Sequence, residues 1–283
     1  EYTVYVRVTN PNYAERTGSG IVKITQRPIS ITAASDSKEY DGTALMNDGW
    51  DRTVCDLADG EAIDSVTVTG SQTDPGSSDN VPKDAVIKRG EEVVTGNYDI
   101  TYKNGTLTVK KNSQTITITA VDDSKIYDGT ALTNDDFSYT TGILASGDLL
   151  TAVVEGTITD VGSVDNVVKS YQVMRGGTDV TSFYTFDTAN GTLTVNKKAL
   201  TITAKSDEKE YDGTALTRNE YEHSGVADGD SLTGVTVTGS QTDVGSSPNV
   251  PSAAVIRRGD KDAAGNYDIE YVNGILKVTK KSQ

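Results

Sequence analysis

Two side chains of the sequence are suited to nucleophilic or acid–base catalysis. His223 is the one histidine and Cys55 the one cysteine among 283 residues. A nucleophilic cysteine needs a base within hydrogen-bond reach, and these two residues lie in different copies of a repeated sequence. Neither a Cys/His metal spacing nor a phosphate-binding glycine-rich loop occurs. The sequence therefore predicts a protein that is not an enzyme.

Aspartates are the second group with usable chemistry. Calcium takes roughly six to eight oxygen ligands, which clustered carboxylates can supply. No ordered Asp-x-Asp-x-Asp-Gly loop occurs, so no cofactor is predicted and calcium is kept as an alternative. The aspartates concerned recur near the front of each repeat, at Asp36, Asp41, Asp122, Asp123, Asp128, Asp207 and Asp212.

Lysines and asparagines recur as well, which raises the alternative of an internal Lys–Asn isopeptide crosslink. The lysines are Lys38, Lys125 and Lys209. Each asparagine precedes a glycine, and Asn-Gly between alternating runs is a strong signal for a type I′ hairpin. A hairpin places its asparagine at the surface, so it is favoured over a crosslink. The pairs are Asn104-Gly105, Asn190-Gly191 and Asn273-Gly274.

All these residues belong to a tandem repeat. The hexapeptide Tyr-Asp-Gly-Thr-Ala-Leu occurs three times, with its tyrosines 87 and then 84 residues apart. Such a period predicts a repeat architecture. The glycine permits a positive φ, and the tyrosine is expected to bury its ring in its own repeat's core while its hydroxyl finds a partner. These signature residues, predicted to be structural, are Tyr40, Asp41, Gly42, Tyr127, Asp128, Gly129, Tyr211, Asp212 and Gly213.

Two further positions recur in every repeat. An aromatic residue follows the hexapeptide at a fixed register, and its varying identity is typical of core filling rather than ligand stacking. A later Arg-Gly pair offers an ion pair to a carboxylate, which would contribute little if exposed. The aromatics are Trp50, Phe137 and Tyr221, and the arginines are Arg89, Arg175 and Arg258.

Composition and charge exclude several classes of partner. The formal net charge of −15 argues against nucleic acid, which requires a basic face, and against adsorption to anionic lipid. We interpret the acidity as favouring solubility. No run of eighteen apolar residues occurs, so no direct membrane insertion of this segment is expected.

The strand pattern predicts an all-β protein built from tandem small β-sandwich (Ig-like) modules arranged end to end. Ile29, Ile31 and Ala33 alternate with polar residues, as on a half-buried strand. Each repeat holds about seven such runs with turn signals between them. A β-grasp-like arrangement with one helix is the alternative fold.

The predicted boundaries follow the period. Residues 1–27 are interpreted as the closing strands of an incomplete upstream repeat, expected to cover their edges by packing against repeat 1 or against a neighbouring molecule. Residues 28–112 form repeat 1, 113–198 repeat 2 and 199–283 repeat 3. The linkers between repeats hold no Gly/Ser run, which favours a monomeric, semi-rigid rod.

The motifs resemble those of MBG or YDG repeat domains. The front motif is Lys-x-Tyr-Asp-Gly-Thr, as at residues 38–43, and the rear motif is Gly-Asn-Tyr-Asp-Ile, as at residues 96–100. Repeat 2 departs in the rear motif, where Ser182-Phe183-Tyr184 stands instead. The resemblance implies a tandem segment of a large, adhesin-like surface protein of bacteria.

Two functions are consistent with this sequence. The first is a non-enzymatic structural stalk in an extracellular protein on the bacterial cell surface. The alternative is an adhesin module that binds an extracellular protein or glycan partner through its loops. The loops that would do so contain Trp50 or follow residues 59, 146 and 228.

Overall fold

The computed structural model describes residues 1–54 and 56–282, and Cys55 lies outside the described residues. Strands and turns make up the described chain, together with three single-turn 3-10 helices. No described helix is long and apolar enough to cross a membrane. The prediction of an all-β protein is confirmed, and a β-grasp helix is not present among the described residues.

The chain divides into two compact units. The first unit comprises Glu1–Gln114, Leu144–Asp148 and Arg175–Thr185, and the second comprises Thr115–Ile143, Leu149–Met174 and Phe186–Gln283. The first unit therefore contains residues 1–27, repeat 1 and short segments of repeat 2. The second unit contains the rest of repeat 2 and all of repeat 3.

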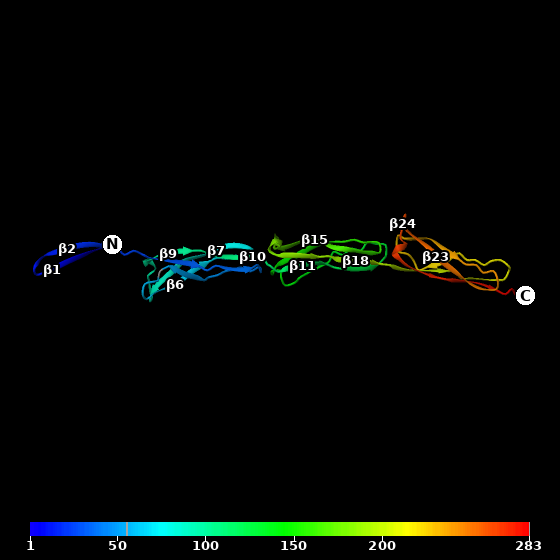
Figure 1. Cartoon of the computed structure of the whole chain (residues 1–283), viewed down its shortest axis with the longest axis horizontal. Coiled ribbons are helices and arrows are strands. Elements are labelled where there is room, and N and C mark those ends of the chain that lie inside the picture. The colour runs from blue at the N-terminus through cyan, green and yellow to red at the C-terminus, as the bar shows by residue number, and fades with distance from the viewer. Residues whose placement is uncertain (55, 283) are drawn as a thin grey trace. The chain divides into compact units, whose positions relative to one another are not determined.

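Repeat 1 is a sandwich of two sheets (Figure 1). One sheet has the order β5-β3-β9, and the other has the order β4-β10-β7-β6 with β8 paired to β7. The pairs β3–β9 and β4–β10 are parallel, and the others are antiparallel. The elements are β3 (Arg27–Ala33), β4 (Asp36–Glu39), β5 (Trp50–Val54), β6 (Glu61–Thr69), β7 (Gly76–Arg89), β8 (Glu92–Val93), η1 (Thr95–Asn97), β9 (Tyr98–Lys103) and β10 (Gly105–Lys110).

The other two repeats have the same strand order. In repeat 2 the elements are β11 (Thr115–Ala120), β12 (Asp123–Ile126), β13 (Phe137–Tyr139), β14 (Asp148–Glu155), β15 (Gly162–Arg175), β16 (Thr178–Asp179), η2 (Thr181–Phe183), β17 (Thr185–Ala189) and β18 (Gly191–Asn196). In repeat 3 they are β19 (Lys198–Ala204), β20 (Asp207–Glu210), β21 (Tyr221–His223), β22 (Ser231–Thr238), β23 (Gly245–Arg258), β24 (Lys261–Asp262), η3 (Ala264–Asn266), β25 (Tyr267–Val272) and β26 (Gly274–Thr279).

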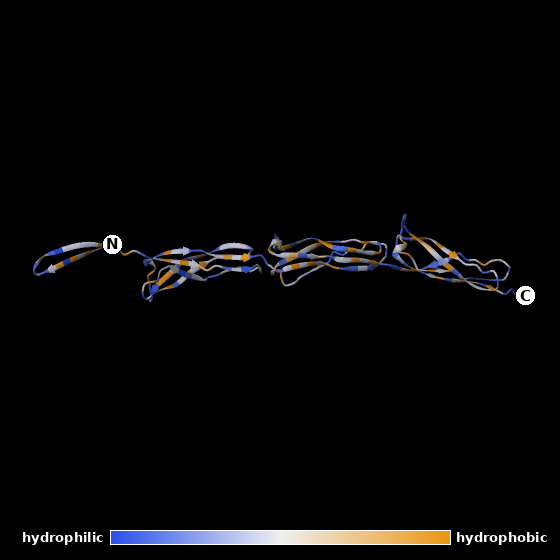
Figure 2. Cartoon of the chain, in the orientation of Figure 1, coloured by the Kyte–Doolittle hydropathy of each residue, from blue (hydrophilic) through white to orange (hydrophobic). Residues whose placement is uncertain are grey.

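Hydrophobic and hydrophilic residues alternate along the strands (Figure 2), and in strands such as β3 and β10 this alternation buries one face. In repeat 1, Ile29, Ile31 and Ile87 are at most 2% exposed. They form a core with Ala85, Val94 and Tyr98, against which Trp50 packs. Trp50 is therefore partly buried at the edge of the core, and Tyr221 packs in the same way in repeat 3. These contacts support the interpretation of the aromatic position as core filling.

The predicted Asn-Gly hairpins are wrong. Strand β9 pairs with β3, whereas β10 pairs with β4 and β7 in the opposite sheet. Asn104 and Gly105 therefore connect two sheets, and neither has a positive φ. Glycine is required for space, because a Cβ on Gly105 would lie 2.2 Å from the Ala34 carbonyl oxygen. A Cβ on Gly191 would lie 2.6 Å from the Ala120 carbonyl oxygen, and one on Gly274 would lie 2.5 Å from that of Ala204.

Residues 1–22 form a separate antiparallel hairpin of β1 (Tyr2–Asn10) and β2 (Tyr13–Val22). Every residue of both strands is exposed, including Tyr5 at 81% and Tyr13 at 79%. The Gln26 side chain donates a hydrogen bond to the Gly96 carbonyl (3.0 Å). Packing of these strands on repeat 1 is therefore wrong, and packing on a neighbouring molecule stays a prediction.

Candidate functional site: the tyrosine joint

The signature residues build a rigid turn at the end of each repeat. In repeat 1, Lys38 Nζ donates to Asp41 Oδ1 (2.7 Å) and to Thr43 Oγ1 (2.6 Å), and the Thr43 backbone N–H donates to Asp41 Oδ1 (2.8 Å). The hydrogen bond from Lys38 lowers the pKa of Asp41 to about 2. Gly42 has the predicted positive φ of 81°. Repeats 2 and 3 have the same bonds around Asp128 and Asp212.

This turn directs Tyr40 out of repeat 1 and into repeat 2. Its ring is 1% exposed. The Tyr40 hydroxyl donates to Asp148 Oδ2 (3.2 Å). The ring packs edge-on against Phe183 and Tyr184, with centroids 5.1 and 5.5 Å away, and the Arg175 guanidinium lies 5.0 Å from its centroid. All these residues belong to the first unit. We call this contact joint A.

The receiving residues form a preorganised socket. The Asp148 side chain is fully buried, and Arg175 Nε donates to its Oδ1 (2.7 Å). The Tyr184 hydroxyl donates to Asp148 Oδ2 (2.6 Å) and accepts a hydrogen bond from the Ala145 backbone N–H (2.8 Å). A buried carboxylate needs such partners, because an unpaired one is costly. The recurring arginine therefore does pair with a carboxylate of its repeat, and the carboxylate of that pair is buried.

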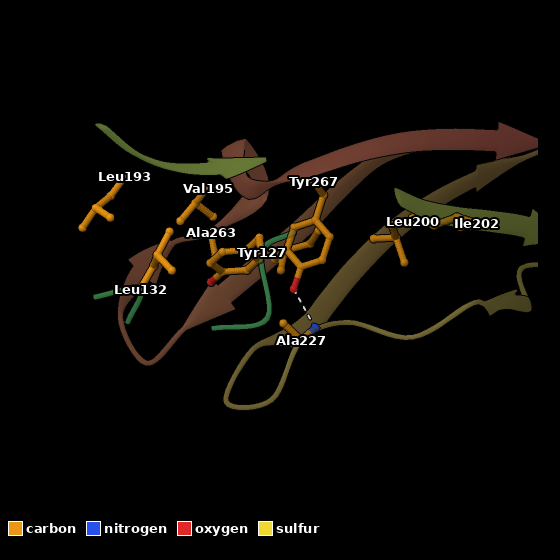
Figure 3. Close-up of a cluster of buried hydrophobic side chains, with 10 residues drawn as sticks. Tyr127, Leu132, Leu193, Val195, Leu200, Ile202, Ala227, Ala263 and Tyr267 are labelled. Atoms are coloured by element: carbon orange, nitrogen blue, oxygen red, sulfur yellow. Dashed lines mark hydrogen bonds between the residues drawn. The ribbon is translucent and has the colours of Figure 1, made fainter. Parts of the chain in front are cut away.

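Joint B repeats this arrangement between repeats 2 and 3, within the second unit. Tyr127, also 1% exposed, donates its hydroxyl to Asp230 Oδ2 (3.0 Å). Tyr267 donates to the same oxygen (2.7 Å), and Arg258 Nε donates to Asp230 Oδ1 (2.7 Å). Figure 3 shows the rings of Tyr127 and Tyr267 side by side, and their centroids lie 5.6 Å apart. Arg258 also donates to the Gly129 carbonyl.

The electrostatics of joint B favour an ionised aspartate and neutral tyrosines. Burial opposes ionisation of Asp230, but hydrogen bonds from Tyr267, Arg258 and Tyr127 outweigh it and lower the pKa of this carboxyl. Burial, followed by the hydrogen bond to Asp230, raises the pKa values of Tyr127 and Tyr267. The joint is therefore held by charge-assisted hydrogen bonds, which are about twice as strong as neutral ones.

The signature glycine also allows the next repeat to approach. A Cβ on Gly42 would lie 2.7 Å from the Ala145 Cβ, and one on Gly129 would lie 2.7 Å from the Asp228 carbonyl oxygen. Around Gly213, which has a φ of 82°, nothing lies within 4 Å of the corresponding position. The turn requires a positive φ at this glycine in all three repeats. The close approach of the next repeat requires the absence of a side chain only at Gly42 and Gly129.

Tyr211 is the third signature tyrosine, and it is 41% exposed. Its backbone is held as in the other repeats, because its N–H donates to the Thr279 carbonyl (2.9 Å) as that of Tyr127 does to Asn196 (2.8 Å). The described repeats place no socket against it. Burial of the signature tyrosine is confirmed for Tyr40 and Tyr127 and is wrong for Tyr211.

The hydrophobic clusters differ for the same reason. In the second unit one cluster crosses joint B: Leu132, Leu193 and Val195 of repeat 2 join Leu200 and Ile202 of repeat 3 through Tyr127. The corresponding residues of repeat 3 form a small cluster by themselves, consisting of Leu216, Leu276 and Val278. The tyrosine therefore connects two cores and is not the core of its own repeat alone.

Repeat 1 contains a third socket, and no described tyrosine enters it. The Tyr98 hydroxyl donates to Glu61 Oε2 (2.5 Å), Arg89 donates to Glu61 Oε1, and the Ala58 N–H donates to the Tyr98 hydroxyl (2.9 Å). The hydrogen bond from Tyr98 lowers the pKa of Glu61. The Arg89 side chain is 54% exposed, against 29% for Arg175 and 30% for Arg258.

The other predicted chemistry does not come together. Lys38 binds the turn, whereas Asn104 donates to Asp79 (2.9 Å), so the two are not a crosslinking pair. Among the described residues, no group of three or more His, Cys, Asp or Glu side chains could hold a metal ion. His223 is exposed, and its Nδ1 accepts a hydrogen bond from the Gly225 N–H (3.2 Å).

Sequence reasoning missed the sockets, although a signal for them exists. Every repeat carries an acidic residue after a Gly, then an arginine before a Gly, then a tyrosine after the 3-10 turn. In repeats 2 and 3 the acidic residue lies in a loop that was considered for ligand binding, after residue 146 or 228. Both loops contact the tyrosine of the preceding repeat instead. The recurring sets are Glu61, Arg89 and Tyr98; Asp148, Arg175 and Tyr184; and Asp230, Arg258 and Tyr267.

The fold and the joints define a class of protein, an all-β tandem repeat in which neighbouring modules share a buried tyrosine. Residues 200–277 match the family model of the MBG domain (YGX type), so repeat 3 is similar to an MBG-type repeat domain. This supports an adhesin-like module, as the sequence motifs indicated. No curated protein matches the chain.

Among solved structures the chain is similar to Drosophila N-cadherin EC1-3. The two are 9% identical, and the alignment covers 88% of this chain and 99% of that one, with a TM-score of 0.27. A TM-score of this size supports no inference about the joints or the function.

Proposed function

We propose that the chain is a structural stalk segment of an extracellular, adhesin-like protein on the bacterial cell surface. It would not be an enzyme, and it would hold a part that binds an extracellular protein or glycan away from the surface. The observation that carries the proposal is the tyrosine joint. At two successive junctions a tyrosine of one repeat is buried in the socket of the next.

Such a joint suits a stalk because it resists bending and separation. Swinging one repeat away from the next would expose the tyrosine ring and the buried carboxylate together. The linker is also fixed at joint A, where the Asn112 N–H donates to the Phe183 carbonyl (2.9 Å) and Asn112 Nδ2 donates to the Tyr40 carbonyl (3.2 Å). A flexible tether would carry Gly/Ser-rich sequence and no such bonds.

The ligand-binding alternative receives less support. Trp50, its strongest candidate for stacking, packs against the core of repeat 1. The loops at residues 144–148 and 227–230 are engaged in the joints. The exposed aromatics at a repeated position, Tyr102 at 38% and Tyr271 at 39%, have their hydroxyls engaged within their own repeats by the Ala85 and Ala254 N–H groups.

Small-angle scattering of the full chain tests the proposal. At about 40 Å per repeat along the strands, a monomeric rod has a radius of gyration near 37 Å. A compact globule of this many residues has one of about 19 Å. We expect a value near the former, and a lower one for the double variant Tyr40→Ala/Tyr127→Ala because its joints are loosened. Tyr211→Ala is the matched control and should change nothing. A radius near 20 Å for the unaltered chain would refute the stalk.

A further inference from the structure

The end of repeat 3 presents the same groups that form a joint elsewhere. We call Tyr211, Gly213, Asp243 and Val244 the Tyr211 face. Val244 is 48% exposed and Tyr211 41% exposed. No other described repeat contacts this face. It presents an aromatic ring (Tyr211), a branched apolar side chain (Val244), a carboxylate (Asp243) and a backbone carbonyl (Gly213).

The counterpart residues of repeat 2 show what such a face binds. Tyr127 enters the socket of repeat 3, and the Gly129 carbonyl accepts a hydrogen bond from Arg258. Asp160 Oδ1 accepts a hydrogen bond from Asn266 Nδ2 (3.0 Å). Val161 packs against the cluster that crosses the joint. Each group of the Tyr211 face therefore has a defined complement in a socket of the same kind.

The two joints differ at one matched pair of positions. In joint B the Val161 backbone N–H donates to Asn266 Oδ1 (2.8 Å). In joint A the residue at the position of Val161 is Pro75, which has no N–H to donate. The residue at the position of Asn266 is then Phe183, whose ring packs on Tyr40.

This pairing follows from hydrogen-bond satisfaction. Asn266 is 7% exposed, so its amide is buried in the joint. An asparagine facing a proline would leave its buried oxygen without a donor, which is costly. A phenylalanine facing Val161 would leave the backbone N–H without an acceptor. The residues at the positions of Val161 and Asn266 therefore determine which socket fits which tyrosine face.

We propose that the Tyr211 face is a docking surface for a further repeat whose socket carries aspartate, arginine and tyrosine with an asparagine directly before the tyrosine. Because Val244 has a backbone N–H as Val161 does, the face selects a socket of the Asn266 type over one of the Phe183 type. This inference rests on the proposed stalk function and assigns the partner of its exposed end.

The test extends the full chain by one repeat. A second copy of residues 197–283 is joined directly after Thr279, so that the new linker matches that of joint B. An exposed Thr217→Ser change in the added copy serves as a mass tag. Nitration by tetranitromethane is then followed for each tyrosine by peptide mass analysis. The original Tyr211 should react at least tenfold more slowly than in the unextended chain, and the Tyr211 of the added copy should stay reactive.

A cycle of variants tests the selectivity. Asn266→Phe in the added copy should restore nitration of the original Tyr211. Adding Val244→Pro to the original repeat 3 should protect the original Tyr211 again, because this pair reproduces the proline and phenylalanine of joint A. Rescue by the second change shows that the first variant still folds. If Tyr211 reacts equally in all extended chains, or the double variant shows no rescue, the proposal is refuted.

Tyr127 in the same samples separates the two proposals. If Tyr127 is protected while the original Tyr211 stays reactive in the extended chain, the docking inference fails and the joint stands. If Tyr127 is also reactive, the joint and the stalk function fail together. If Tyr211 is already protected in the unextended chain, a second copy occupies the face and the in-line partner is refuted.

Discussion

Replacing Tyr127 by alanine tests the central feature of the structure, a tyrosine that belongs to one repeat and is buried in the next. Truncating a fully buried large aromatic residue costs roughly 3–5 kcal/mol. Part of this loss is the hydrogen bond to the ionised Asp230, for which about 1.5–3 kcal/mol is usual. We therefore expect Tyr127→Ala to destabilise joint B by roughly 3–5 kcal/mol. Tyr127→Phe should cost about 1–2 kcal/mol, because Tyr267 and Arg258 still satisfy the carboxylate.

The chain supplies its own control for this change. Tyr211 occupies the same turn and is 41% exposed, whereas Tyr127 is 1% exposed. Tyr211→Ala removes the same atoms without opening a cavity, so its effect should stay within about 0.5 kcal/mol, as for ordinary surface changes. A difference of several kcal/mol between two chemically identical substitutions would come from the joint alone.

Hydrogen exchange measured by mass spectrometry suits this comparison, because a chain of several repeats does not unfold in two states. In Tyr127→Ala, protection should fall on both sides of joint B, in residues 191–196 and in residues 227–230. Protection in repeat 1 should not change. If Tyr127→Ala and Tyr211→Ala alter exchange equally, or if the loss is confined to repeat 2, the tyrosine does not couple the repeats and the reasoning is wrong.

Three more predictions concern the same joint. The pKa of Asp230 is lowered in the folded chain. The stability that the ionised carboxylate contributes to joint B is therefore present above the unfolded pKa of about 3.9, and it is lost as pH falls through the folded pKa. Acid unfolding followed by circular dichroism should show joint B weakening only below about pH 4. The pKa values of Tyr127 and Tyr267 are raised, so stability should fall as pH rises above about 10, and ultraviolet titration should find these two phenols ionising late. Gly129→Ala should destabilise the chain more than Gly213→Ala in thermal melts, because both strain a positive φ but only the first meets the next repeat; equal effects would argue against close approach at the joint.

Local signals were sufficient for the strands and the turn. Alternation over Ile29, Ile31 and Ala33 predicted a buried face, and the residues are at most 3% exposed. The Asp-Gly pair predicted a positive φ at Gly42, which the structure has. These features depend on neighbours within a few residues, and the sequence states those neighbours directly.

The destination of the tyrosine could not be predicted in the same way. The sequence indicates that Tyr127 requires burial and a hydroxyl partner, but Asp230 lies 103 residues away. In a tandem repeat, equivalent positions one period apart carry nearly the same residues. A socket in the same repeat and a socket in the next one therefore have the same sequence signature, and only three-dimensional distance separates them.

The Asn-Gly prediction failed for a different physical reason. Two consecutive strands joined by Asn-Gly usually pair with each other, but β9 has a stronger alternative in parallel pairing with β3 along six residues. The connection then crosses between sheets, and Gly105 is selected by the nearby carbonyls of Ala33 and Ala34. A glycine required for a close approach and a glycine required for a positive φ look identical in the sequence.

The joint also gives the repeats a direction. Each repeat carries its tyrosine turn and its socket on different surfaces, so the contact is heterologous. One repeat can therefore bind the preceding repeat through its socket and the following repeat through its tyrosine at the same time. Heterologous contacts that do not close into a ring extend without limit, and no symmetry fixes how many repeats follow one another. Each added repeat then buries one tyrosine and one carboxylate, and its stability depends on its neighbour as well as on its own core. This dependence accounts for the Lys-x-Tyr-Asp-Gly-Thr motif at residues 38–43: lysine, aspartate and threonine hold the turn, the tyrosine enters the next repeat, and the glycine leaves room for it.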